Sequence, residues 1–200
     1  LSHVLVALCL ALSVPQITAC SLPGQGIQKY DTLVAADERC NQKWADIEAQ
    51  LQRRYDLIPN LVSTIKASAK FEEQTLTAVM AARNAASGMK MSGEDFADPE
   101  KMQKFQEAQS NLRRNMILVQ EAYPDLKASA QFKDLMISLE GSENRLLRAR
   151  EEYNKAVGAF NSELRNFSGK IINPLTNSEF KPRVYFSADQ GAKSAPAVSF

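Results

Sequence analysis

The feature that most constrains this fold is a run of apolar residues spaced alternately three and four positions apart. Residues 132–167 keep this spacing with one departure, two successive steps of four from Ala149 to Val157. Such a period, about 3.5 residues, places all the apolar side chains on one face of an α-helix that supercoils with its partners. The run consists of Phe132, Leu135, Leu139, Ser142, Leu146, Ala149, Tyr153, Val157, Phe160, Leu164 and Phe167. This helix must therefore pack along its whole length against other helices.

Three further stretches show the same helical spacing. The first comprises Leu33, Ala36, Cys40, Trp44, Ile47, Leu51, Tyr55 and Ile58. The second runs over residues 61–80, and the third over 105–123 follows Asp98 and Pro99, a typical N-cap and first helical residue. We therefore predict an all-α protein whose residues 30–170 form a long antiparallel four-helix bundle. Residues 21–29 are predicted to be a linker, and 171–200 an irregular C-terminal tail.

The first twenty residues form a targeting segment. From Val4 to Val14 the chain is uncharged and rich in Val, Leu and Ala, the length of a signal-peptide core and short for a membrane span of about 20 residues. The segment ends in Ile17-Thr18-Ala19-Cys20, which resembles a bacterial lipobox. Lipidation of Cys20 is the leading expectation, and an uncleaved single span and simple secretion are the alternatives. Cys40 is left without a disulfide partner and is expected to be a small buried hydrophobic residue.

The stretch QRRYDLIPN, residues 52–60, carries a proline inside an apolar periodic run. Proline lacks an amide hydrogen and is tolerated in the first turn of a helix but not in its interior. We therefore expect a hairpin corner here, with Pro59 in the first turn of a new helix and Asp56 as its N-cap. Arg53 and Arg54 would end the preceding helix, where cations interact with free carbonyls.

Three stretches also resemble one protein family. They are QRRYDLIPNLVSTIK from residue 52, EAYPDLKASAQFKDLM from residue 121 and YNKAVGAFN from residue 153. They resemble the LemA family of bacterial membrane-associated helical proteins, and the resemblance covers about residues 30–167. It implies an N-terminal membrane attachment and a helical bundle, without an established enzymatic activity. The motif residues that we treat as structural or functional candidates are Arg53, Arg54, Asp56, Pro59, Asn60, Glu72, Arg83, Arg150, Tyr153, Asn154 and Asn161.

Composition and residue types exclude several classes of function. The chain has 24 basic and 23 acidic residues, so no overall field attracts nucleic acid. Its single histidine, His3, lies in the targeting segment. The rest of the chain therefore lacks an imidazole for general-base catalysis, for a hydrolase triad or for a typical zinc site. We expect no cofactor and no metal, and no catalytic residue can be named.

Two functional hypotheses remain. The first is a non-catalytic, membrane-tethered scaffold or adaptor of the bacterial cell envelope, with its bundle outside the cytoplasm and an envelope protein as partner. The second is a hydrolase or lipid-handling protein that acts through a carboxylate such as Glu72. On the helical spacing Glu72 and Arg83 lie in line with the core residues of their helix, so each is expected to need a buried partner. We expect Glu72 to pair with an arginine of the third or fourth helix, and Arg83 with an acid or amide of a neighbouring helix.

Overall fold

The computed structural model describes residues 22–68, 72–177 and 179–187. In these ranges it contains five α-helices, two short 3-10 helices and no strand, which confirms the all-α prediction. None of the helices in the described ranges has the length and hydrophobicity needed to cross a membrane. The predicted targeting segment with Cys20 lies outside the described residues.

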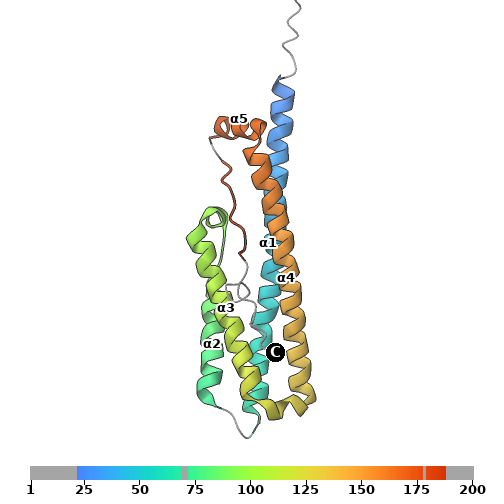
Figure 1. Ribbon diagram of the computed structural model, residues 1–200, viewed down its shortest axis with the longest axis vertical. Coiled ribbons are helices and arrows are strands. Elements are labelled where there is room, and N and C mark those ends of the chain that lie inside the picture. The colour runs from blue at the N-terminus through green and yellow to red at the C-terminus, as the bar shows by residue number, and fades with distance from the viewer. Residues whose placement is uncertain (1–21, 69–71, 178, 188–200) are drawn as a thin grey trace, which may run out of the picture.

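Two long helices, α1 (Leu22–Lys66) and α4 (Ala130–Arg165), lie side by side along most of the molecule (Figure 1). Lys29 pairs with Glu163 near one end, and Gln50 accepts a hydrogen bond from Arg145 further along. The later of these two residues on α1 contacts the earlier of the two on α4, so the two helices are antiparallel. Most of the apolar positions that define their predicted faces are buried.

A shorter hairpin consists of α2 (Glu73–Gly88) and α3 (Pro99–Ala122), joined through the 3-10 helix η1 (Gly93–Ala97). It lies beside part of the α1 and α4 pair (Figure 1). Asp98 caps α3 as expected, because its carboxylate accepts from the amides of Glu100 and Lys101. A second 3-10 helix, η2 (Pro124–Ala128), leads from α3 into α4.

The predicted hairpin corner at residues 52–60 is wrong, because α1 continues through Pro59 and ends at Lys66. The missing amide hydrogen of Pro59 leaves the carbonyl of Tyr55, four residues earlier, without its helical donor. The Nε of Arg83 on α2 fills that role at 3.1 Å. Asp56 is therefore not a cap, and its carboxylate accepts from Gln52 on the exposed side of α1.

Both predicted non-helical ends also differ from expectation. Within the described residues α1 extends back to Leu22, so the predicted linker is helical from that residue on. At the other end, α5 (Phe167–Leu175) lies crosswise on the end of α4 (Figure 1). Residues 180–187, which we call the strap, are extended and return along α4 toward the middle of the molecule. Part of the predicted irregular tail is thus a helix and a bound segment.

Candidate functional site

A buried ion pair links α1 to α4. The side chain of Arg54 is only 2% exposed and pairs with Glu143, which remains partly accessible. Its guanidinium also donates to the amide oxygen of Gln109 on α3, at 3.4 Å. The prediction that Arg54 ends a helix is therefore wrong. Its buried charge needs Glu143 as a partner.

The same polar network extends through Gln109 to α2. The Nε2 of Gln109 donates to the hydroxyl of Tyr55 at 2.7 Å, and that hydroxyl donates to the carbonyl of Ala86 at 3.2 Å. Burial is the main cause that raises the pKa of Tyr55. Side chains or carbonyls of α1, α2, α3 and α4 thus meet in one network. This arrangement fixes the relative positions of the four helices and offers no open site for a substrate.

The two asparagines of the YNKAVGAFN motif bind the strap. Asn161 donates to the carbonyl of Arg183 at 2.8 Å and accepts from its amide at 2.9 Å. Asn154 makes the same pair of bonds with Phe186, at 3.0 and 2.9 Å. We call each asparagine with its pair of bonds a clamp. The seven residues from Asn154 to Asn161 rise about 10.5 Å along α4, and the three from Arg183 to Phe186 span about 10 Å when extended, so both clamps form simultaneously. An amide side chain suits each position because its carbonyl oxygen accepts while its separate NH2 group donates.

The strap buries every third side chain. Phe180, Arg183 and Phe186 are buried, whereas the residues between them are exposed or partly exposed. A period of three is that of a polyproline II segment, which makes no internal hydrogen bonds and leaves its backbone available to other groups. Asn173 on α5 supplies a third clamp, which binds both the amide and the carbonyl of Phe180.

The buried side chain of Arg183 connects the strap to α1. Its Nε donates to Asp37 at 2.8 Å and a terminal nitrogen donates to Asn41 at 2.7 Å. Its guanidinium also lies 4.9 Å from the centre of the Phe96 ring, a cation–π distance. The strap is therefore held by a buried charge pair as well as by its backbone.

The candidates Tyr153 and Arg150 contact this region, and Cys40 lies close to it. Tyr153 is fully buried, and burial raises its pKa to about 12 against a smaller lowering effect of Arg183. Burial likewise raises the pKa of Cys40 to about 11, so the thiol stays protonated near neutral pH and is a small core residue, as predicted. Arg150 places its guanidinium 5.2 Å from the centre of the Phe186 ring. All three fit structural roles in the core.

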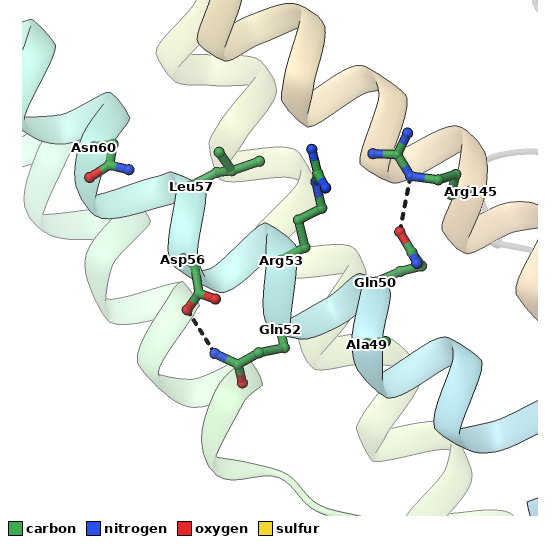
Figure 2. Close-up of a pocket in the computed structure, with 8 residues that line it drawn as sticks. All are labelled: Ala49, Gln50, Gln52, Arg53, Asp56, Leu57, Asn60 and Arg145. Carbon is green, nitrogen blue, oxygen red and sulfur yellow. Dashed lines mark hydrogen bonds between the residues drawn. The ribbon is translucent and has the colours of Figure 1, made fainter. Parts of the chain in front are cut away.

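The remaining motif residues lie on the outside of the molecule. Arg53, Asp56 and Asn60 line an open hollow between α1 and α4, to which α4 contributes Arg145 (Figure 2). In Figure 2 the side chain of Arg53 extends toward the α4 side, where Arg145 hydrogen-bonds Gln50 at 3.1 Å. Asn60 also lines a second hollow with Gln131, Asp134, Leu135 and Ser138. The exposed face of α1 and the neighbouring face of α4 thus form one surface that carries two guanidinium groups, which we call the α1/α4 face.

The predicted partner of Glu72 is wrong. Glu72 is exposed at the N-cap of α2, where its carboxylate accepts from Thr75. Its backbone amide receives no helical partner at this position and instead donates to the Tyr123 hydroxyl at 2.9 Å. Helical periodicity misplaced Glu72 because α2 begins only at residue 73. Glu72 lines neither of the two hollows described above.

The prediction for Arg83 needs a smaller correction. Its partner on the neighbouring helix is the backbone carbonyl of Tyr55, not an acidic or amide side chain. The side-chain amide that it contacts belongs to the next residue, Asn84. Within the described residues, no group of acidic, cysteine or histidine side chains could hold a metal ion.

We expect Pro59 and Arg83 to be energetically coupled. Arg83→Ala should lower the free energy of unfolding by about 1–3 kcal/mol, because the Tyr55 carbonyl loses its donor. In a Pro59→Ala background the new amide can bond that carbonyl, so the loss should shrink by about 1 kcal/mol. Denaturant unfolding of the two single variants, the double variant and the parent, followed by circular dichroism, measures this coupling. Arg83→Ala removes the Asn84 contact in both backgrounds, so the energy of that contact cancels in the coupling. Strictly additive losses would contradict the role of Arg83 as donor to the Tyr55 carbonyl.

Sequence reasoning missed several residues of these networks. Gln109 was detectable, because it lies on the helical face between Phe105 and Leu112. Glu143, Asp37 and the strap residue Arg183 carry no local signal, because their burial depends on segments far away in the chain.

Comparison with known proteins agrees with the fold. The chain is 24% identical over 192 residues to each of two magnetosome proteins, MamQ 1 and MamQ 2, of Paramagnetospirillum magneticum (strain ATCC 700264 / AMB-1). Each alignment covers 86% of this chain and 70% of the relative. The profile of the LemA family matches residues 43–200, so the match continues past residue 167 and includes the strap. Since this match covers more than half of the chain and includes the asparagine clamps together with the strap that they bind, the protein belongs to the LemA family.

Proposed function

We propose that this protein is a non-catalytic, membrane-tethered scaffold of the bacterial cell envelope that binds a partner protein through its α1/α4 face. The tether is the N-terminal segment, attached through Cys20 or as a span, and the helices extend from it outside the cytoplasm. The distribution of polar groups supports this proposal. The buried charges Arg54 and Arg183 pair with Glu143 and Asp37, so they serve the fold. The motif residues that do not serve the fold face outward.

The chemistry of the α1/α4 face favours a protein partner with an acidic segment. Arg53 and Arg145 contribute two guanidinium groups against the single carboxylate of Asp56, which accepts a hydrogen bond from Gln52. Guanidinium groups bind carboxylates with two parallel hydrogen bonds, and the amides of Gln50 and Asn60 can bond peptide groups. Ala49 and Leu57 lie beside them and contribute to an apolar part of the lining. The hollow is open and shallow, which suits a protein surface better than an enclosed small molecule.

Charge reversal on this face tests the proposal. The full-length protein would be captured from its own membranes as the parent, as Arg53→Glu/Arg145→Glu, and as Arg148→Glu. Arg148 is exposed on α4 but does not line the hollow, so it is the matched charge-reversal control. We expect the same envelope protein to co-purify with the parent and the control, and its recovery to fall at least about tenfold with the double variant, a loss of about 1.4 kcal/mol.

Two outcomes would contradict this function. Equal recovery with all three proteins would show that the partner binds elsewhere. Recovery of no protein above the background of an unrelated membrane-tethered protein would rule out the scaffold role itself. Thermal unfolding of the three proteins should agree closely, since the replaced side chains are exposed and surface changes usually alter stability by less than about 0.5 kcal/mol.

A further inference from the structure

The orientation of α5 is set by a sharp turn at Asn166, between α4 and α5. Asn166 ends α4 and caps α5, because its side-chain oxygen accepts from the amide of Gly169 at 2.8 Å. Gly169 lies against the last turn of α4, where an added Cβ would come within 2.3 Å of the Glu163 carbonyl oxygen. Only glycine permits this approach, so α5 lies crosswise on the end of α4 (Figure 1).

The two faces of α5 differ in their contacts. Gly169 and Ile172 are buried against the bundle. On the opposite face, Ile171 is 48% exposed and Leu175 is 78% exposed, next to exposed Lys170 and Pro174. This face points away from the bundle and has no partner among the described residues. Ile171 and Leu175 lie four residues apart, so their side chains adjoin and form an apolar patch on one face of a short helix. Apolar patches, unlike single exposed apolar residues, mark surfaces that bind a partner or a membrane.

The same end of the molecule carries the start of α1. The described chain begins at Leu22, immediately after the predicted targeting segment, so a membrane attached through that segment lies at this end. Lys29 pairs with Glu163, and the Tyr30 hydroxyl donates to Glu179 at 3.0 Å, so α5 lies about two turns below Leu22. Eight helical residues rise about 12 Å, and a tilt of α1 toward α5 brings the exposed face to the bilayer surface. Ile27, on those first turns, is also exposed.

We propose that the exposed face of α5 inserts into the interfacial layer of the membrane as a second point of attachment. Ile171 and Leu175 enter the boundary between headgroups and acyl chains, and Lys170 lies among anionic headgroups, as in amphipathic helices that lie in the membrane plane. Two large apolar residues bind a bilayer weakly by themselves. The tether keeps α5 close to the surface, so its contact becomes effectively intramolecular. This second contact fixes the tilt of α1 and, with it, the direction in which the α1/α4 face is presented.

The inference rests on the tether of the proposed function, and photolabelling can test it separately. The full-length protein, purified from its own membranes, would be reconstituted in vesicles of phosphatidylethanolamine and phosphatidylglycerol. A diazirine-bearing amino acid would replace Leu175, or Leu147 as the control. Leu147 is 57% exposed and lies on α4 well away from α5. After illumination, we expect lipid adducts at position 175 to exceed those at position 147 by at least about tenfold, because only α5 reaches the acyl boundary.

The other outcomes are distinct. Equal lipid labelling at the two positions, in protein that floats with the vesicles, would overturn the α5 contact and leave the tether intact. Adducts from position 175 to a second protein copy would overturn it as well, since a protein then covers this face. Protein that does not float would overturn the tether and the α5 contact together.

Discussion

Replacing Phe186 by alanine is expected to lower the free energy of unfolding by about 3–5 kcal/mol, as for other buried aromatic residues. The ring stacks on Trp44 at a centroid distance of 5.7 Å and meets the edges of Tyr153 and Phe105 at 5.6 and 6.3 Å. These rings belong to α1, α4 and α3, so the strap supplies the side chain around which three helices pack. Removal of the ring leaves a cavity that a rigid aromatic cluster cannot fill.

The neighbouring residue provides the control. Tyr185 is 44% exposed, and Tyr185→Ala should cost less than about 1 kcal/mol. Denaturant unfolding of the full-length proteins, followed by circular dichroism and by the fluorescence of Trp44, compares the two variants. Trp44 is the only tryptophan and stacks on Phe186, so its emission reports directly on this cluster. Similar small losses for both variants would show that the strap is an accessory to the core and not part of it.

The apolar faces of the helices could be predicted from the sequence because helix packing requires a local period. Trp44, Leu51 and Ile58 on α1 and Leu146, Tyr153 and Phe160 on α4 are buried as the spacing predicted. The strap could not be predicted in this way. The residues that contact it belong to α1, η1, α3, α4 and α5. Its own period of three repeats over only Phe180, Arg183 and Phe186. A pattern of only three residues cannot be recognised before the residues that it packs against are known.

The error at Pro59 has a different cause. The rule against proline inside a helix assumes that the freed carbonyl stays without a donor. Here a side chain from α2 supplies that donor, and no local feature of residues 52–60 indicates it. Once α1 is continuous, the spacing itself places Arg54 on the buried face, three residues after Leu51 and four before Ile58. The wrong boundary therefore concealed the buried charge.

Part of the candidate site was predictable from local spacing, and part depended on distant segments. Arg53, Asp56 and Asn60 follow one another at helical spacing, and the structure brings them together on one exposed surface. Their grouping was available from the sequence, because residues three and four apart on a helix are neighbours. The contribution of Arg145 was not, because it depends on the register between α1 and α4.

Glu143→Ala is expected to lower the free energy of unfolding by about 3 kcal/mol or more, because it leaves the Arg54 guanidinium buried without its counter-charge. Gln109 remains near Arg54 but offers only a neutral oxygen at 3.4 Å. The matched control is Glu140→Ala, one helical turn earlier on α4, where the side chain is exposed and the cost should stay below about 0.5 kcal/mol. Denaturant unfolding by circular dichroism measures both, and equal costs would contradict a structural role for the pair.

Replacing both partners separates stability from specificity. In Arg54→Leu/Glu143→Leu no charge is stranded, so most of the lost stability should return, as it does when other buried ion pairs are replaced by apolar residues. The pair contributes the register between α1 and α4. Two helices with uniformly spaced apolar faces can shift by one turn against each other, whereas a buried charge pairs in only one position. We therefore expect the double variant to unfold with a smaller denaturant dependence than the parent, the result of a less uniquely packed native state. Full stability with an unchanged slope would show that the aromatic cluster and the asparagine clamps fix the register without Arg54 and Glu143.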